Sequence, residues 1–140
     1  MSACIFCSIV KGDIPAFRIY EDQDHLAFLD IYPAALGHTL VIPKKHSSDI
    51  HEITGAEYGA MASRAKIVAD LIQEKLATDG VTIMQMNRAA GWQSVFHTHF
   101  HVIPRFTSDN LIQPWKPAAA SQDELTEIHS RIIQSQLSES

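Results

Sequence analysis

The sequence segment QSVFHTHFHVIPR places His97, His99 and His101 at every second position before it reaches a proline. In a β-strand, residues two apart lie on the same face, separated by roughly 6.6 Å along the chain. The alternation therefore predicts a strand that carries three imidazoles on one face. Phe100 and Val102 fall on the opposite face, where we expect them to pack against helices.

Three interpretations of these imidazoles differ in their chemistry. Solvated surface histidines are the least favoured, because exposed strand positions more commonly carry Thr or Lys. Two histidines two residues apart could instead chelate a catalytic Zn²⁺ with a third ligand from elsewhere. The third interpretation is metal-free covalent catalysis, in which one imidazole is the nucleophile and its neighbours orient it and adjust its protonation.

The rest of the chain predicts an α+β fold. Short runs rich in β-branched and aromatic residues, separated by turn residues, predict four further strands: 16–22, 25–31, 38–43 and 81–87. The last of these should form a hairpin with the histidine segment. A capping box at Thr54 and Glu57 opens a long amphipathic helix that ends near residue 79, and a second at Ser121 and Glu124 opens a C-terminal helix. We expect an antiparallel sheet of about five strands with these helices packed on it.

Composition limits the class of protein. The chain has 140 residues, of which 46% are hydrophobic and 19% charged, so it can bury a core as one domain. Its formal net charge of -5 argues against a general nucleic-acid or anionic-membrane binder, because such binding needs clustered Lys and Arg. No apolar run approaches the roughly 20 residues that cross a bilayer, and the N-terminus carries no basic leader. We expect a cytoplasmic protein without nucleic-acid or membrane partners.

The two cysteines of the chain, Cys4 and Cys7, have C-x-x-C spacing. In a reducing compartment, this spacing indicates metal binding or redox chemistry more than a structural disulfide. Two cysteines supply only half of a tetrahedral zinc site, so the motif alone does not identify the remaining ligands.

The histidine segment resembles the H-x-H-x-H signature of the histidine triad (HIT) superfamily. The resemblance extends to CIFCSIVKGDIPAFRIYED, LAFLDIYPAALGHTLVIPKKH and GWQSVFHTHFHVIPR, in order and spacing. Within the superfamily, the chain is similar to bacterial proteins of the Hint-like branch. The resemblance implies one HIT-like domain over 1–140, with a core at 4–105 and a C-terminal extension and helix at 106–140.

The resemblance also implies a reaction. In such proteins the middle histidine, here His99, attacks the α-phosphate of a nucleotide and forms a covalent nucleotidyl-histidine that water hydrolyses. A neutral imidazole suits this role if its other nitrogen donates to a fixed acceptor, which is a backbone carbonyl in the family. His101 corresponds to the histidine that contacts the phosphate oxygens. His38 corresponds to a fourth histidine of the family, which lies beside the phosphate and the nucleophile. Ser94 corresponds to a hydrogen-bond donor to the phosphate or the leaving group.

Further positions match those that hold the nucleotide in the family. Asp30 corresponds to a carboxylate on the ribose hydroxyls, which suits a side chain that only accepts. Gln93, like Ser94, corresponds to a residue that hydrogen-bonds the phosphate or the leaving group, and Asn87 to one that lines the same pocket. The residues that match the purine slot are Phe6, Ile14, Phe28, Leu29 and Ile31. Trp92 departs from the pattern, because close relatives often have glycine there, and it puts the carry-over of substrate preference in doubt.

Some bacterial family members complete a zinc site with the histidine of PKKH and the first triad histidine. The resemblance therefore implies a structural Cys₂His₂ zinc site made of Cys4, Cys7, His46 and His97. On this interpretation His97 binds a metal, and the reaction itself requires no cofactor.

The function that follows is cleavage of purine nucleoside 5′-phosphoramidates, or related nucleotidylated compounds, by a homodimeric hydrolase or transferase. The bound ligand would be a purine nucleotide of the AMP or GMP type. One alternative is a dinucleoside polyphosphate hydrolase that uses the same His99. Others are a nucleotide-binding regulatory module without significant catalysis and a hydrolase with a catalytic zinc on the triad.

Overall fold

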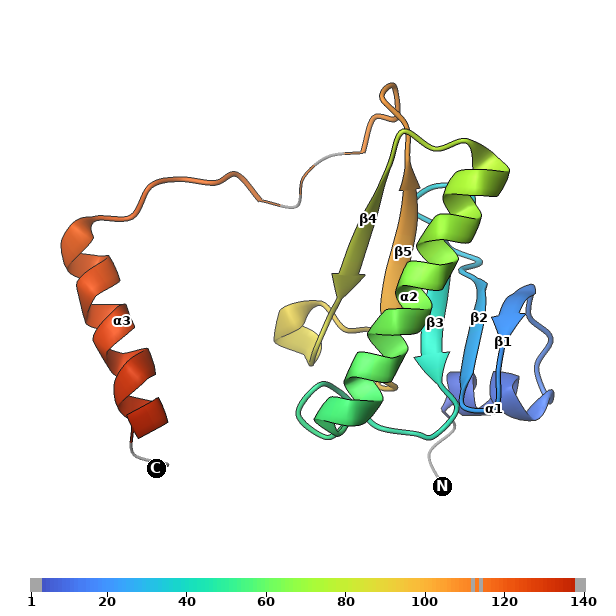
Figure 1. Cartoon of the computed structure of the whole chain (residues 1–140), viewed down its shortest axis with the longest axis horizontal. Helices are drawn as coiled ribbons and strands as arrows, with labels where there is room; N and C mark the ends of the chain where they lie inside the picture. Colours follow the sequence, from blue (N-terminus) through green and yellow to red (C-terminus); the bar gives the residue numbers. More distant parts are fainter. Residues whose placement is uncertain (1–3, 112, 114, 138–140) are drawn as a thin grey trace. The chain divides into compact units, whose positions relative to one another are not determined.

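In the computed structural model, which describes residues 4–111, 113 and 115–137, five strands form one antiparallel sheet in the order β1-β2-β3-β5-β4 (Figure 1). The strands are β1 Arg18–Glu21, β2 His25–Leu29, β3 Thr39–Pro43, β4 Gly80–Gln85 and β5 Phe100–Arg105. The predicted α+β class is confirmed, and β4 pairs with β5 as the hairpin prediction requires.

The two faces of the sheet are covered by different helices. The long helix α2, Gly55–Leu76, buries Met61, Ala65, Val68 and Ile72 against one face. That face presents Ala27, Val41, Phe100 and Val102, so the histidine segment does turn its apolar residues toward a helix. The alternate residues of β2 and β3 point to the other face, which packs on the short helix α1, Ile5–Lys11. This second cluster contains Phe6, Ile9, Leu26, Phe28, Leu40 and Ile42.

The sequence patterns above do not predict α1. Its seven residues bury only Phe6 and Ile9, too few to give a clear helical periodicity. The available signal was Gly12, which follows the last helical residue with a φ of 86°. Glycine favours that left-handed conformation and often ends helices.

The prediction that all three triad histidines lie in one strand is wrong in part. β5 begins at Phe100, so His97 and His99 belong to the segment before it. The ladder ends there because β4 stops at Gln85, the partner of Phe100. Next to this point, the backbone oxygen of Pro43 on β3 accepts a hydrogen bond from the side chain of His97, whose Nε2 lies 2.8 Å away.

The second capping box also forms as predicted. Ser121 Oγ accepts from the Glu124 amide at 3.1 Å at the start of α3, Gln122–Leu137. This helix belongs to a separate unit, residues 110–140, whereas the sheet belongs to the unit 1–109. The prediction of one domain over 1–140 stays a prediction, and its ends at 1–3 and 138–140 lie outside the described residues. No helix in the described part of the chain is long and apolar enough to cross a membrane.

Candidate functional site

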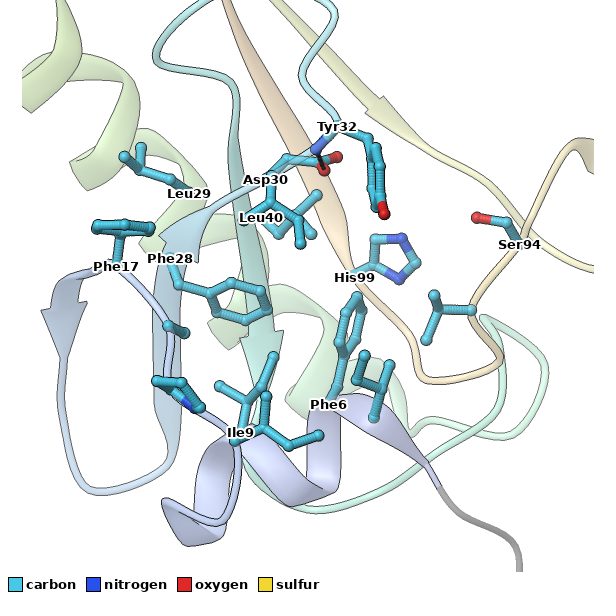
Figure 2. Close-up of a pocket in the computed structure, with 16 residues that line it drawn as sticks. Phe6, Ile9, Phe17, Phe28, Leu29, Asp30, Tyr32, Leu40, Ser94 and His99 are labelled. Carbon is cyan, nitrogen blue, oxygen red and sulfur yellow. Dashed lines mark hydrogen bonds between the residues drawn. The ribbon is translucent and has the colours of Figure 1, made fainter.

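A cavity of about 580 Å³ opens beside α1 and the end of β2 (Figure 2). This volume lies within the range of about 300–1,000 Å³ that is typical of small-molecule sites. Eight of the predicted nucleotide-binding residues line it: Phe6, Ile14, Phe28, Leu29, Asp30, Ile31, Ser94 and His99. The described residues Asn87, Gln93 and His101 were predicted with them but do not line this cavity.

The cavity has further lining residues that the sequence analysis missed: Ile5, Ile9, Pro15, Ala16, Phe17, Tyr32, Leu40 and Val95. Ile9 follows Phe6 at helical spacing, a signal that becomes readable only once α1 is known. Tyr32 projects its ring toward His99 from the turn after β2 (Figure 2). Its backbone amide donates to Asp30 Oδ1 at 2.8 Å, so this carboxylate fixes the turn that carries the ring.

The imidazole of His99 is buried and has a defined tautomer. Its Nδ1 lies 2.6 Å from the backbone oxygen of His97. A carbonyl oxygen only accepts, so Nδ1 carries the proton and Nε2 keeps a free lone pair. Burial lowers the pKa of His99, against the opposing influence of this hydrogen bond and of the charge on Asp30. A neutral ring with an unprotonated Nε2 is the form that a nucleophilic histidine requires.

A second set of groups, which we call the aspartate–histidine cluster, consists of Asp30, His38 and His101. His38 Nδ1 accepts from the backbone amide of Ala34 at 3.0 Å, so the proton of a neutral His38 lies on Nε2. That Nε2–H donates to His101 Nδ1 at 3.0 Å, and Asp30 Oδ2 lies 3.7 Å from the same nitrogen. The proton of a neutral His101 is therefore on its own Nε2.

Burial keeps both histidines of this cluster neutral. It lowers the pKa of His101 to about 4, and repulsion from His99 and His38 acts in the same direction. Burial likewise lowers the pKa of His38, although Asp30 raises it. The rings of His99 and His101 are adjacent, with centroids 4.8 Å apart. The site thus presents a lone pair on His99 next to a hydrogen-bond donor on His101.

The side chain of Gln93 forms hydrogen bonds with the backbone of the loops near the cavity. Its Nε2 donates to the backbone oxygens of Ser48 at 2.6 Å and Val95 at 3.0 Å, and its Oε1 accepts from the Arg88 amide at 2.6 Å. The Asn87 side chain similarly accepts from the Ile50 amide at 2.7 Å. These contacts join the loop after β3 to the loop before β5. Contact of either side chain with a ligand stays a prediction.

Trp92 stands in the same loop with a φ of 75°, just after the short helical turn Ala89–Gly91. A positive φ is strained for a residue with a Cβ atom and favours glycine. The backbone thus gives a physical reason why relatives would place glycine at this position.

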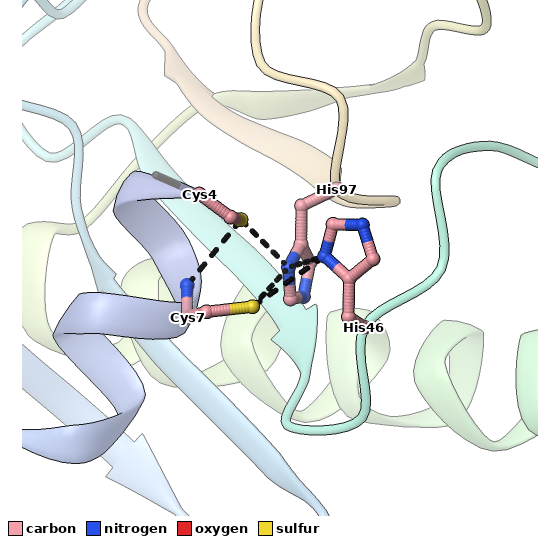
Figure 3. A group of neighbouring side chains, drawn as sticks. All are labelled: Cys4, Cys7, His46 and His97. Atoms are coloured by element: carbon pink, nitrogen blue, oxygen red, sulfur yellow. Dashed lines mark hydrogen bonds between the residues drawn. The ribbon is translucent and has the colours of Figure 1, made fainter. Parts of the chain in front are cut away.

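The third group of side chains, the cysteine–histidine cluster, consists of Cys4, Cys7, His46 and His97 (Figure 3). Cys4 caps α1, Cys7 lies in its first turn, and the histidines come from two loops. His97 Nδ1 lies 3.4 Å from Cys4 Sγ, 3.6 Å from Cys7 Sγ and 3.2 Å from His46 Nδ1. His46 Nδ1 lies 3.4 Å from Cys7 Sγ.

These separations fit a tetrahedral metal. With Zn–S near 2.3 Å and Zn–N near 2.05 Å, a tetrahedron separates sulfur from nitrogen by about 3.6 Å and two nitrogens by about 3.3 Å. His97 has the tautomer that such a site needs, because its Nε2–H donates to the Pro43 oxygen and leaves the Nδ1 lone pair free. Burial lowers the pKa of His97 to about 4 and so keeps that lone pair unprotonated.

Comparison with known proteins identifies the family to which this chain is similar. A protein-family model described as the HIT domain matches residues 11–108. The adenosine 5′-monophosphoramidase of Saccharomyces cerevisiae is 35% identical over 133 residues, which cover 94% of this chain and 82% of that protein. A crystal structure of a HIT family protein from Bacillus subtilis superposes with a TM-score of 0.87 at 38% identity, covering 95% of this chain and 96% of that one.

A second structural relative bears on the cysteine–histidine cluster. It is a Zn-bound histidine triad family protein from Mycobacterium smegmatis, with a TM-score of 0.77 and 38% identity. The match covers 96% of this chain and 97% of that one.

Proposed function

Because the chain belongs to the HIT domain family, we propose that it hydrolyses purine nucleoside 5′-phosphoramidates, or related nucleotidylated compounds, through a covalent intermediate on His99. The observation that carries the proposal is the tautomer of His99, whose Nδ1–H donates to the His97 oxygen at 2.6 Å. Its Nε2 is the atom free to attack phosphorus. The similarity to the yeast adenosine 5′-monophosphoramidase supports the choice of substrate.

In the proposed reaction, His99 Nε2 forms a bond to the α-phosphorus while the bond from phosphorus to the leaving nitrogen breaks, and that nitrogen keeps the bonding pair, takes a proton from solvent and departs as the free amine. Negative charge remains on the non-bridging oxygens, and the Nε2–H of His101, whose ring adjoins that of His99, could donate to them. The Ser94 hydroxyl, which also lines the cavity, can donate to a phosphate oxygen or to the leaving group. Water then cleaves the nucleotidyl-histidine and restores the free imidazole.

The nucleoside would occupy the apolar part of the cavity. Phe6, Ile14 and Ile31, which line it, would contact the base. Asp30, just after β2, also lines the cavity, and its carboxylate could accept from the ribose hydroxyls. Phosphate at His99 and ribose at Asp30 place the base toward α1.

We also propose that the cysteine–histidine cluster holds a structural zinc ion. Its two thiols and two imidazole nitrogens would supply all four ligands of a tetrahedral zinc ion, which leaves no position for a substrate. When bound, zinc would cross-link the chain and contribute to its folding free energy. The reaction above uses only side chains of the chain.

A cytoplasmic homodimer remains part of the proposal. β4 is at the edge of the sheet, and its Val81 and Ile83 are 42% and 44% exposed. A second copy of the chain could cover this apolar edge. Light scattering of the purified protein tests this, and a monomer at micromolar concentration would contradict it.

Trapping the intermediate tests the proposed reaction. Protein is mixed with an adenosine 5′-phosphoramidate, quenched within milliseconds and digested for mass spectrometry. We expect an adenylyl adduct on His99. Turnover without such an adduct contradicts covalent catalysis, whereas faster cleavage of a diadenosine polyphosphate would assign the alternative substrate. AMP binding without turnover of either compound would support a regulatory module.

A further inference from the structure

One wall of the cavity comes from the N-terminal segment 5–17, which contains α1 and the turn after it. Helices shorter than about 12 residues are marginal by themselves, and α1 has seven. The position of this wall therefore depends on what anchors α1. Phe6 and Ile9 anchor it to the sheet by packing against β2 and β3.

The cysteine–histidine cluster is the second anchor of α1 (Figure 3). Cys4 and Cys7 belong to the beginning of the helix, His46 follows β3, and His97 precedes β5. A metal held by all four would join three segments that are distant in sequence at a single point. Without it, the start of α1 would be held mainly by the packing of Phe6 and Ile9.

Phe6 connects this anchor to the cavity. It lies between the two cysteines in the sequence, and its ring meets the ring of His97 edge-on with centroids 5.8 Å apart. The same ring meets His99 at 5.1 Å and Phe28 at 5.4 Å, and it lines the cavity. A shift of α1 would therefore change both the cavity wall and the surroundings of His99.

The backbone provides a second connection. His97 directs its Nδ1 toward the cysteines, while its own carbonyl oxygen accepts from His99 Nδ1. The residue that would bind the metal thus also sets the orientation and tautomer of the imidazole that lines the cavity.

From these two connections we infer that metal binding at the cysteine–histidine cluster and nucleotide binding in the cavity are positively coupled. The inference rests on the nucleotide site proposed above. Coupling between two sites is reciprocal, so a metal that strengthens nucleotide binding by some factor is itself bound more tightly by that factor when nucleotide is present. We expect a factor of about 10, within the usual range of about 5 to 150.

Two titrations of the full chain test the coupling. In the first, calorimetry compares the AMP dissociation constants of zinc-loaded protein and of protein stripped with a chelator, and we expect about tenfold weaker binding after stripping. In the second, a chromophoric chelator competes for zinc with and without saturating AMP. We expect AMP to raise the zinc affinity by the same factor. The second titration starts from loaded protein, so it remains informative if stripped protein unfolds.

Three variants accompany these titrations. His46→Ala removes a ligand from an exposed position outside α1, and its AMP affinity should match that of stripped wild-type protein. Phe6→Leu should reduce the coupling factor toward one, because it removes the aromatic ring that meets both His97 and His99. Lys11→Ala, at the exposed end of α1, is the matched control and should keep the full factor.

The outcomes separate the two proposals. Equal AMP affinity of folded loaded and stripped protein, or a zinc affinity that AMP does not change, overturns the coupling and leaves the proposed function intact. Failure of zinc-loaded protein to bind AMP overturns the nucleotide site and the coupling together.

Discussion

The cysteine–histidine cluster and the aspartate–histidine cluster both contain two imidazoles whose nitrogens nearly touch, at 3.2 Å and 3.0 Å. In each cluster, one backbone group sets the tautomer of the histidine that it contacts. In the first, the Pro43 oxygen accepts from His97 and leaves a lone pair facing its neighbours. In the second, the Ala34 amide donates to His38 and leaves a proton facing its neighbour. Histidine clusters of similar geometry can therefore bind a metal or pass on a hydrogen bond, depending on the backbone behind them.

The charge of the buried imidazoles does not distinguish the two clusters. Burial lowers the pKa of His97 and of His101 to about 4, so both rings are neutral at pH 7. The direction of the backbone hydrogen bond and the presence of two thiols are the features that differ. His99 lies between the clusters and takes its own tautomer from the His97 oxygen.

The largest effect should come from His99→Ala, which removes the proposed nucleophile between the clusters. We expect phosphoramidate turnover to fall at least about 1,000-fold, equivalent to roughly 4 kcal/mol in the barrier. Zinc content should stay unchanged, because the backbone oxygen and the side chain of His97 remain. Steady-state kinetics and metal analysis measure the two properties. His129→Ala, an exposed histidine in α3, is the control, and turnover by His99→Ala at the wild-type rate would contradict the mechanism.

The next largest effect should be a loss of zinc affinity at the cysteine–histidine cluster. His46→Ala removes one of the four proposed zinc ligands, and about 10–16 kcal/mol of zinc-binding free energy shared among four ligands gives roughly 3 kcal/mol for each. Zinc affinity should therefore fall about 100-fold in competition with a chromophoric chelator. His51→Ala removes an exposed histidine from the same loop and should leave the affinity unchanged. An unchanged affinity in His46→Ala would exclude this histidine as a ligand.

A smaller effect should come from the protonation of His101 in the aspartate–histidine cluster. The pKa of His101 is about 4 in the folded protein and near 6.5 in the unfolded chain, so the unfolded chain binds more protons between these values. Stability is thus lost as pH falls from about 6.5 toward 4. At pH 5 the loss from His101 is about 2 kcal/mol.

Urea unfolding of zinc-loaded protein at pH 7 and pH 5 measures this loss. His101→Gln has no titrating ring, so its stability should fall by about 2 kcal/mol less than that of the wild-type protein. Acid release of zinc affects both proteins equally and cancels in the comparison. Identical losses in both proteins would mean that the folded environment does not depress the pKa of His101.

The strands, the long helix and the C-terminal helix could be predicted because each has a local signal, such as the capping boxes at Thr54 and Ser121. Two features could not. α1 is too short for its periodicity to be recognised, and β5 begins only at Phe100, where its neighbour β4 ends at Gln85, which is a property of the sheet. The tautomers of His38 and His97 were equally unpredictable, because they depend on Ala34 and Pro43 backbone groups brought near by the fold.

The site residues divide in the same way. Spacing and family resemblance identified half of the residues that line the cavity and all four members of the cysteine–histidine cluster. They could not reveal that three backbone groups bind the Gln93 side-chain amide, because one of these contacts, to the Ser48 oxygen, joins residues 45 apart in the sequence. Tyr32 was missed because a tyrosine in a turn carries no pattern of its own.

The last prediction is that the aspartate–histidine cluster binds no zinc, so that the number of zinc ions bound per chain does not change when this cluster is altered. Asp30, His38 and His101 have a ligand composition that could bind zinc, and their donor atoms lie within 4.8 Å of one another. Zinc on His38 Nε2 would require the proton on Nδ1, where it would oppose the Ala34 amide. Zinc titration should therefore saturate at one ion per chain, in the wild-type protein and in Asp30→Asn alike. Two ions in the wild type and one in Asp30→Asn would show that the backbone amide does not prevent metal binding, and the contrast between the two clusters would fail.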